Sequence, residues 1–278
     1  MVPLMNTSLP ITSAQNPKVK QLQRLREKRE RSQEQKFLIE GYREILRASS
    51  AKQPIETLFL CEELFLGSHE PELIQKVRLQ GAHIYTLPKE LFCRCSYRDR
   101  PDGLIAIAPI RRQSFASFKE AIYKRAAGQP LFLVIAESIE KPGNLGSMFR
   151  SADAAYVHGI LVCDRQTDVF NPNVVRSSIG TLFTVPFIEC SLEEALQFLQ
   201  QEGVALVAAT PHAQQLFTRI DLQDSVAIAM GSEQLGLSEE LMQKAALHAK
   251  IPMLGEADSL NVAAATTLLL YEVVRQRS

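Results

Sequence analysis

Three short segments in the C-terminal half of the chain carry polar side chains beside glycines, and each follows or ends an apolar, strand-like run. They are Glu140–Asp153 (EKPGNLGSMFRSAD), Met230–Glu240 (MGSEQLGLSEE) and Ile251–Asn261 (IPMLGEADSLN). Glycine allows a sharp turn and a close approach of the backbone. A helix that begins just after such a loop offers free N–H groups to a ligand. The loops are therefore candidates for a shared ligand site, although an ordinary strand–turn–helix explains each of them singly.

The polar residues of these loops fall at helix starts. Ser259 or Asn261 is a natural N-cap for a buried helix that the Ala- and Leu-rich run predicts over Val262–Val274. Arg150 lies on a predicted helix one turn after Gly146. Glu233 follows an apolar strand and could simply cap a helix. GxGxxG, GxxxxGK[ST], HExxH and GxSxG motifs are absent, so the common dinucleotide, phosphate-loop, zinc-protease and serine-hydrolase signatures do not apply.

Composition is that of a soluble globular protein: 278 residues, 46% hydrophobic and 22% charged. This length allows two modest domains or one large one. The longest apolar runs resemble Leu131–Ala136 and are far too short for a membrane span, and residues 1–10 lack the features of a secretory signal. We therefore expect a reduced, cytoplasmic protein without a structural metal. The cysteines are scattered and form no CxxC pair; they are Cys61, Cys93, Cys95, Cys163 and Cys190.

Charge is divided unevenly along the chain. Residues 1–127 carry 22 Lys and Arg against 14 Asp and Glu, whereas residues 128–278 carry 9 against 17. This asymmetry suggests two domains with different partners, the basic one facing a polyanion. A solvated helix face is the alternative interpretation. One predicted helix carries much of the positive charge, at Lys18, Lys20, Arg24, Arg26, Lys28, Arg29 and Arg31.

Strands alternate with helices in both halves. The first half predicts a small α/β domain with helices near 17–32, 42–48 and 71–80 and strands near 37–41, 55–61, 83–87 and 103–108. A helical connector is expected at 115–127. The second half predicts a parallel sheet buried on both faces, with strands 131–136, 160–163, 204–209, 226–230 and 249–253 and helices 146–156, 173–179, 192–201 and 238–246. Ligands bind such sheets beyond the carboxyl ends of the strands.

The order and spacing of the three loops are far more specific than any one of them. NxGxxxR (Asn144–Arg150), GSExxGL (Gly231–Leu237) and IPMxGxxxSLNV (Ile251–Val262) together closely resemble the motifs of the SpoU (TrmH-type) RNA ribose methyltransferases of the knotted SPOUT superfamily. Phe170–Pro186 also looks like the segment between the first two family motifs. One departure is that alanines follow SLNV, where a serine often comes.

The resemblance implies a domain arrangement. It implies an RNA substrate-binding domain at residues 1–112, a helical connector at 113–130 and a SpoU-type methyltransferase domain at 131–278. That last domain would be an α/β domain with a deep trefoil knot, an exception to the rule that chain connections do not thread. It further implies S-adenosylmethionine as methyl donor, held largely by backbone groups of Thr210, Pro211, Gly231, Ile251, Met253 and Leu260.

The reaction implied is methylation of a ribose 2′-hydroxyl. The family places an arginine, here Arg150, beside that hydroxyl and often treats it as the base. A guanidinium stays charged in proteins, so we interpret Arg150 as a clamp for the 3′-phosphate that stabilises developing alkoxide charge. Asn144 and Asn261 would orient groups by hydrogen bonds. Ser259 would cap the helix or line the site, and Glu233 would hold a loop or Arg150.

The resemblance also implies RNA as partner and a homodimer that pairs through the C-terminal domain, with helix Val262–Arg275 as a possible interface. Ribosomal RNA is the expected substrate because of the extra N-terminal domain, and transfer RNA is the nearest alternative. A non-catalytic RNA-binding protein of this fold and an unrelated small-ligand α/β enzyme are further alternatives. The candidate RNA contacts are Arg24, Lys28, Arg29, Arg165 and Arg176.

Overall fold

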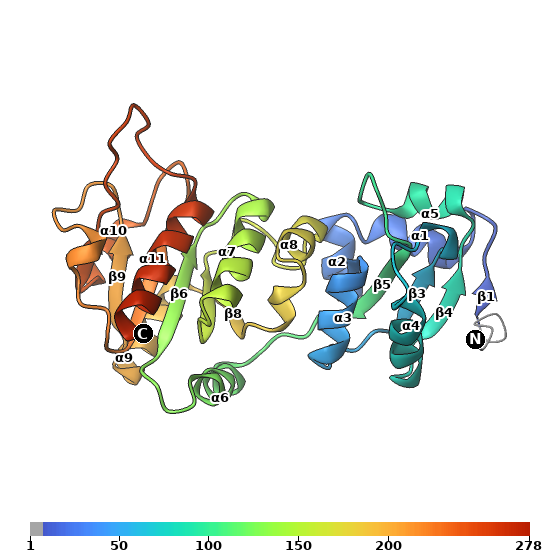
Figure 1. Ribbon diagram of the computed structural model, residues 1–278, viewed down its shortest axis with the longest axis horizontal. Coiled ribbons are helices and arrows are strands. Elements are labelled where there is room, and N and C mark those ends of the chain that lie inside the picture. Colours follow the sequence, from blue (N-terminus) through green and yellow to red (C-terminus); the bar gives the residue numbers. More distant parts are fainter. Residues whose placement is uncertain (1–7) are drawn as a thin grey trace. The chain divides into compact units, whose positions relative to one another are not determined.

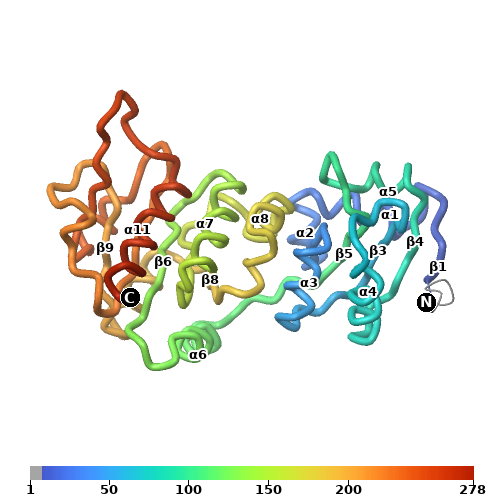
Figure 2. Tube along the Cα trace, in the orientation of Figure 1, coloured from blue at the N-terminus to red at the C-terminus, as the bar shows by residue number. Residues whose placement is uncertain are grey.

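The computed structural model describes residues 8–278 and divides into two compact units. Unit 1 runs to Arg111 and takes in Val169–Thr184 from later in the chain. Unit 2 comprises Arg112–Asp168 and Val185–Ser278. The chain path can be followed by colour in Figures 1 and 2. Each unit is an α/β structure with its own sheet.

Unit 1 is built on a mixed sheet whose strand order is β1-β4-β3-β5-β2. Strands β1, β4 and β3 are parallel to one another, whereas β5 is antiparallel to both β3 and β2. The strands are β1 (Leu9–Pro10), β2 (Lys36–Glu40), β3 (Thr57–Leu60), β4 (His83–Thr86) and β5 (Leu104–Pro109). The helices are α1 (Pro17–Arg24), α2 (Lys28–Glu34), α3 (Tyr42–Ser50), α4 (Glu70–Leu79), α5 (Lys89–Cys95) and α8 (Pro172–Ser177), with short 3₁₀ turns η2 (Glu62–Leu64) and η3 (Thr181–Phe183).

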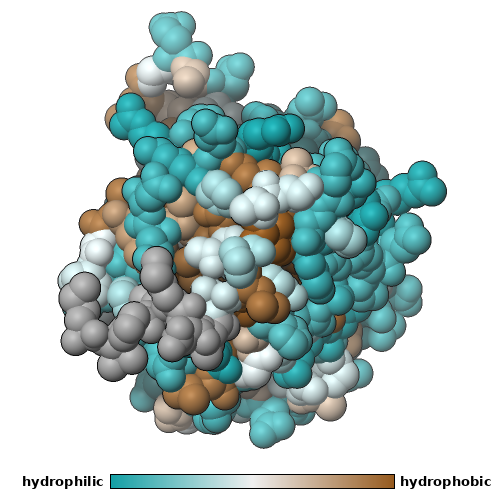
Figure 3. Space-filling view, turned by 90° about the vertical axis from the view of Figure 1, so that its right-hand side faces the viewer, coloured by the Kyte–Doolittle hydropathy of each residue, from teal (hydrophilic) through white to brown (hydrophobic). Residues whose placement is uncertain are grey.

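The alternation of side chains along each strand supplies both faces of this sheet. On β2, Leu38 packs with α1 and α5 in one core cluster, while Phe37 points to the opposite side and contacts Phe170 and Phe183. Helices therefore cover both faces of this sheet. The surface of unit 1 seen from the β1 edge is mostly hydrophilic, with a small group of apolar side chains near its centre (Figure 3).

The basic stretch near the N-terminus was predicted as one helix and is two. Helix α1 ends at Arg24, and α2 begins at Lys28. The Arg31 guanidinium, 1% exposed, donates to the carbonyl oxygens of Leu25 (3.0 Å) and Arg26 (2.6 Å), which the interrupted helix leaves without partners. Arg31 is thus a buried clamp of the turn. It is not one of a row of exposed cations.

Segment Val169–Thr184 was expected to belong with the methyltransferase domain, and its contacts group it with unit 1. Helix α8 packs beside β2, and η3 packs against α3. The Asn173 side chain donates to the Tyr97 hydroxyl at 2.8 Å, and Arg47 donates to the Ile179 carbonyl oxygen. The other assignment came from the resemblance of Phe170–Pro186 to the segment between the first two family motifs. A sequence pattern does not reveal which sheet face a short apolar segment covers.

Unit 2 contains a six-stranded sheet in the order β11-β9-β10-β6-β7-β8, with every neighbouring pair parallel. The parallel sheet predicted from the sequence is confirmed. The strands are β6 (Phe132–Glu137), β7 (Gly159–Cys163), β8 (Phe187–Cys190), β9 (Ala205–Ala209), β10 (Val226–Met230) and β11 (Leu247–Ala249). The helices are α6 (Phe115–Ala126), α7 (Pro142–Ala154), α9 (Leu192–Glu202), α10 (Glu239–Lys244) and α11 (Val262–Arg277), with a 3₁₀ turn η4 (Phe217–Arg219).

Helix α6 is as predicted, but it is more than a connector. Its Phe118 and Ile122 are fully buried in a core cluster with α9 and the sheet. Helices α7 and α11 pack side by side away from that cluster (Figure 1). Two details of the strands differ from expectation. Strand β8 was missed, and β11 ends at Ala249 because Lys250 bonds to Gln215 instead of continuing the sheet.

A buried histidine joins β6 to the turn before β7. The backbone N–H of Phe132 donates to the ring Nδ1 of His158 at 3.0 Å, and the backbone N–H of His158 donates to the Phe132 carbonyl oxygen at 2.7 Å. Burial, with help from Arg277 and Arg125, lowers the pKa of His158 from 6.5 to about 4. The folded protein therefore holds this imidazole neutral.

Acid should weaken the fold through His158. Well above pH 6.5 the His158 ring is neutral in both the folded and the unfolded state, and its protonation does not lower the unfolding free energy. As the pH falls towards 4, the ring is protonated in the unfolded chain but stays neutral in the folded one, so the unfolding free energy decreases. At pH 5 we expect this group to cost about 2 kcal/mol of unfolding free energy. Urea unfolding at pH 7.5 and pH 5 should show that loss in the parent, and His158→Asn should remove most of it. An unchanged difference in the variant would exclude His158 as its source.

Candidate functional site

The predicted loops leave neighbouring strands of unit 2 at one edge of its sheet. Thr210 follows β9, Gly231 follows β10, and Ile251 lies just beyond β11. Strand β6, which pairs with β10, leads into α7 and its Asn144 and Arg150. Strands β7 and β8 are added on one side of β6, and the later strands β9, β10 and β11 lie on its other side. The loops therefore meet beside the switch point of the sheet, where parallel α/β domains bind ligands.

Side chains from all three motifs form one hydrogen-bonded group. Asn144 Nδ2 donates to Glu233 Oε1 at 2.6 Å. Asn261 Nδ2 lies 3.1 Å from both Asn144 Oδ1 and Glu233 Oε1 and donates to them. These residues lie 28 to 117 positions apart in the sequence, so only the fold brings them together. The structure thus joins the three loops that the sequence identified, through an Asn–Glu–Asn lock.

Lys141, which sequence reasoning missed, completes the lock by forming an ion pair with Glu233. The hydrogen bond from Lys141 is the main cause that lowers the pKa of the Glu233 carboxyl, and the Asn144 amide adds to it. Glu233 therefore remains an acceptor for both amides. Lys141 stands in the first loop, three residues before Asn144, and no local pattern marks it as the partner of Glu233.

Asn261 settles the choice of helix cap. Its Oδ1 accepts from the backbone N–H groups of Ala263 (3.0 Å) and Ala264 (3.4 Å), so Asn261 is the N-cap of α11. Ser259 is exposed and lies outside the helix. The same asparagine side chain thus caps the helix with its oxygen and binds the other two loops with its nitrogen.

Arg150 is held differently from the lock residues. It is exposed on α7, and no hydrogen bond or ion pair to it occurs within residues 8–278. Glu233 holds the loop and does not contact Arg150, which decides between the two roles considered for Glu233. The neighbouring Ser151 hydroxyl lies 2.7 Å from Thr267 Oγ1 on α11, so the backbone next to Arg150 is fixed. A free guanidinium on a fixed helix can meet an anionic ligand.

Gly231 allows the second loop to fold back on itself. A Cβ at this position would overlap the backbone of Gly236 and Leu237. Ser232 and Gly236 exchange backbone hydrogen bonds of 3.0 Å in both directions, and this bridge places Glu233 at the loop tip. Buried Glu137 anchors the far end, where its Oε2 accepts from the Ser238 N–H at 2.9 Å. Glu137 ends an apolar strand, and no sequence pattern indicated this role.

The third loop presents unused backbone groups. Within the described chain, residues 251–260 make no backbone hydrogen bond, although Thr210 N–H donates to the Ala249 carbonyl oxygen just before them at 3.0 Å. Leu254 is 97% exposed and Leu260 is 38% exposed. Thr210 also lines a cavity of about 380 Å³ with His212 and His248. The loop therefore offers N–H and C=O groups, with apolar side chains, to a ligand.

The chain matches the SpoU rRNA methylase family model over residues 131–271, slightly more than half of its length. It is also 31% identical to a 23S rRNA (uridine(2479)-2'-O)-methyltransferase of Streptomyces viridochromogenes, over 95% of this chain and 92% of the relative. The chain belongs to the SpoU methyltransferase family. The fold expected from the resemblance is confirmed at the level of an α/β domain with a parallel sheet and a smaller N-terminal domain.

Solved structures agree with this SpoU assignment along nearly the whole chain. The crystal structure of an RNA 2'-O ribose methyltransferase is 36% identical, with a TM-score of 0.80, and the match covers 97% of this chain and 99% of that one. An AdoMet-bound rRNA methyltransferase from Sinorhizobium meliloti is 28% identical, with a TM-score of 0.84, covering 96% and 97%. Residues 16–106 match an MRM3-like substrate binding domain.

The predicted RNA contacts of this SpoU protein have different environments. In unit 1, Lys28 and Arg29 are exposed without a partner in the described chain, whereas Arg24 pairs with Glu34 at 3.2 Å. Arg176 is exposed on α8. In unit 2, Arg165 is half-buried in an ion pair with Glu189, which makes it the least available of the five.

Residues 8–278 contain neither a metal-binding cluster nor a membrane-spanning helix. No group of three or more His, Cys, Asp or Glu side chains is arranged to bind a metal ion. No helix in this part of the chain has the length and apolar character to cross a membrane.

Proposed function

We propose that the protein transfers a methyl group from S-adenosylmethionine to a ribose 2′-hydroxyl of RNA. The observation that carries the proposal is the Asn144–Glu233–Asn261 lock with unpaired Arg150 on the helix of Asn144. It joins the three family motifs at one sheet edge and leaves one cation free. Relatives with whole-chain matches bear names of rRNA 2'-O-methyltransferases.

The residues around the loops fit the methyl donor. Free backbone groups in residues 251–260, together with Thr210, Pro211 and Gly231, would hold it, with Ile251, Met253 and Leu260 around it. An adenine needs such N–H and C=O partners and apolar flanks. The missing side chain of Gly231 keeps the backbone of the second loop accessible. When bound, S-adenosylmethionine supplies a methyl group on a positively charged sulfur, which is already a good electrophile.

Arg150 would act on the acceptor. Its charged guanidinium binds the phosphate 3′ to the target ribose and stabilises the negative charge that develops on the 2′-oxygen. The hydroxyl proton passes to water or to that phosphate, since a guanidinium cannot accept it. Much of the rate then comes from positioning of the hydroxyl, to which the rigid lock contributes. Ser259, exposed beside Asn261, would line the acceptor side.

Ribosomal RNA is the substrate that the comparisons favour. The MRM3-like match over residues 16–106 supports a substrate-binding module in unit 1, where exposed Lys28 and Arg29 supply positive charge. Transfer RNA is the second candidate, because one relative of 30% identity is named a tRNA/rRNA methyltransferase. An enzyme of either kind would work in the cytoplasm.

Incubation with methyl-labelled donor tests the function. Deproteinised ribosomal RNA should become labelled, and purified transfer RNA should not. After alkaline hydrolysis the label should remain in a dinucleotide, because the phosphodiester bond next to a 2′-O-methylated ribose is not cleaved. Label in transfer RNA alone would favour the second substrate. Binding of both RNAs without label would identify a non-catalytic RNA-binding protein.

Glu233 provides a test of the lock. Glu233→Ala removes the acceptor shared by two amides, and each lost hydrogen bond is worth about 1 kcal/mol. We expect donor affinity to fall about tenfold as the loops separate. Glu233→Gln keeps an acceptor oxygen and should lose much less. Calorimetric titration with S-adenosylmethionine measures both, and equal losses would mean that charge, rather than the shared acceptor, matters.

We also propose the knotted connection and the homodimer implied by the family. Helix α11 exposes a stripe at Ala264, Leu268 and Tyr271, with Leu268 44% and Tyr271 48% exposed. Such a stripe is suited to pairing with a second copy.

Sedimentation tests the pairing. The parent should sediment at twice its 31.1 kDa mass, and Leu268→Glu should yield monomer. Leu79→Glu changes a leucine of unit 1 that is 78% exposed and should leave the dimer intact. A parent that is monomeric at micromolar concentration would contradict the dimer without affecting the site.

A further inference from the structure

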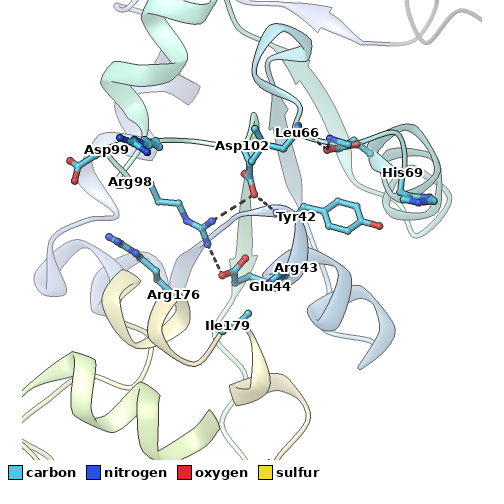
Figure 4. Close-up of a pocket in the computed structure, with 13 residues that line it drawn as sticks. Tyr42, Arg43, Glu44, Leu66, His69, Arg98, Asp99, Asp102, Arg176 and Ile179 are labelled. Carbon is cyan, nitrogen blue, oxygen red and sulfur yellow. Dashed lines mark hydrogen bonds and ion pairs between the residues drawn. The ribbon is translucent and has the colours of Figure 1, made fainter.

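Unit 1 contains a cavity of about 800 Å³ that the sequence did not indicate (Figure 4). The start of α3, the turn before α4, the loop Arg98–Asp102 and the end of α8 surround it. Its volume lies in the range of pockets that bind small ligands or parts of larger ones. All of its lining residues belong to unit 1. It is therefore separate from the loops that carry the methyltransferase motifs.

The cavity is preformed by an ion-pair network around Arg98. The Arg98 guanidinium donates to Glu44 and to the Glu40 carbonyl oxygen at 2.9 Å, and it lies 3.7 Å from Asp102 Oδ2. The same Asp102 oxygen accepts from the Tyr42 N–H at 2.8 Å. Figure 4 shows these groups meeting in the middle of the site. Because Arg98 is neutralised by buried carboxylates, it fixes the walls and does not supply free charge.

Glycine is required where α3 begins. Gly41 has φ +114, and a Cβ there would overlap the Glu44 carboxylate and the Arg98 guanidinium. A second wall is fixed by Glu70, whose Oε1 accepts from the N–H groups of Leu66 (3.2 Å) and Gly67 (2.9 Å). These contacts occupy one oxygen each of Glu44, Asp102 and Glu70, whereas Glu70 Oε2 and Asp102 Oδ1 are buried without a hydrogen-bond partner among the described residues. The remaining charges are those at the rim.

The rim carries an excess of positive charge. Arg43, Arg100 and Arg176 are exposed, and none of them has a hydrogen-bond or ion-pair partner within residues 8–278. Asp99 is the exposed acid among the lining residues. Three unpaired guanidiniums from three separate segments converge on one cavity. Guanidinium is the side chain best suited to binding phosphate, because its planar donors match two phosphate oxygens.

The cavity also offers an aromatic surface. Tyr42 is half-buried, and in Figure 4 its ring lies on the side opposite Arg98 and Arg176. Proteins that recognise single-stranded RNA stack splayed bases on aromatic rings while cations bind the phosphates. The Tyr42 ring and the exposed arginines line the same cavity, so both elements are present in it.

We propose that this cavity binds a nucleotide of a single-stranded segment of the RNA substrate, other than the nucleotide that is methylated. Arg43, Arg100 and Arg176 hold its phosphates, and the base stacks on Tyr42. The inference rests on the proposed function for the identity of the RNA. The binding itself can be measured without any methyl transfer. It places one predicted RNA contact, Arg176, in a shaped site, whereas the predicted contacts on α1 and α2 form an open basic surface.

The test uses the full-length protein and a double substitution at the rim, Arg43→Gln with Arg100→Gln. The probe is deproteinised ribosomal RNA, with a short single-stranded RNA of mixed sequence as a second probe. Losing two phosphate contacts should weaken binding about tenfold at low salt and reduce the salt slope by about 1.4 for the single strand. Tyr42→Leu should weaken binding several-fold, and Tyr42→Phe should restore it.

The matched control changes two exposed, unpaired cations of α5, which do not line the cavity: Lys89→Gln with Arg94→Gln. It should alter binding less than twofold. Equal losses in the rim and control variants would show a diffuse charge effect and overturn the cavity, as would equal affinities of Tyr42→Leu and Tyr42→Phe. Donor affinity, measured separately, should stay unchanged in every rim variant.

The two proposals fail differently. If the parent protein labels no RNA but the rim variants lose RNA binding, the cavity stands and the methyltransferase assignment falls. If the parent methylates ribosomal RNA and the rim variants bind it as tightly as the parent, the cavity proposal alone is wrong.

Discussion

Replacing Arg150 with alanine should lower the rate of methyl transfer about 100- to 1000-fold while leaving the affinities for RNA and donor within a few-fold of the parent. The expected size is that of removing one charged donor aimed at a developing oxyanion. Because Arg150 is exposed and has no partner in residues 8–278, its removal leaves no buried group unsatisfied. Single-turnover kinetics with saturating RNA separates this loss from binding.

Arg150→Lys is the matched variant. It keeps the positive charge but loses the planar pair of donors, so it should recover part of the rate and not all of it. A fully active Arg150→Ala enzyme with normal RNA binding would remove Arg150 from the reaction. If Arg150→Ala lost RNA affinity in proportion to rate, the residue would be a binding contact that acts equally on ground state and transition state.

Much of the site was predictable because its residues lie in local patterns that the fold must place together. Carboxyl ends of parallel strands share one edge, so Asn144, Glu233 and Asn261 had to come near one another once the sheet was parallel. The start of α11 was likewise a local signal, since a capping residue just before an Ala/Leu run marks a helix start; the choice of Asn261 over Ser259 needed the structure. Whether these residues carry catalysis stays a prediction.

Other features depend on contacts that leave no local mark. Lys141 pairs with a residue more than ninety positions away, and nothing in its neighbourhood indicates this. Arg31 looked like one more exposed cation, yet it is buried because it satisfies the carbonyl groups of a helix break. Arg165 is less accessible to RNA than expected because it forms an ion pair with Glu189, which lies on β8, the strand that sequence reasoning missed.

The assignment of Val169–Thr184 shows the same limit at a larger scale. Its apolar residues predict burial, but Phe170 could pack on either sheet, and the ring of Phe37 in unit 1 is what it contacts. Arg176 and Ile179 of this segment line the cavity of unit 1, so the cavity depends on that packing and cannot be predicted from the charge of the sequence. Long-range packing thus decided which arginines are free.

Gly231→Ala should be the most damaging small substitution in unit 2. The added Cβ would overlap the Gly236 carbonyl group and the Leu237 nitrogen, which are backbone atoms and cannot swing aside. The loop must open, so the reciprocal Ser232–Gly236 hydrogen bonds break and Glu233 leaves the two asparagines. We expect a loss of about 3 kcal/mol in unfolding free energy, at the upper end for overpacking, together with at least tenfold weaker donor binding.

Gly143→Ala is the control for this prediction. A Cβ at Gly143 meets nothing within 4 Å and sits in the first turn of α7, where alanine is favoured over glycine. Its stability should equal or slightly exceed that of the parent in urea unfolding. If Gly231→Ala were as stable as Gly143→Ala and bound the donor normally, the folded-back second loop would not be what holds Glu233 in the lock. The joining of the three motifs would then need another cause.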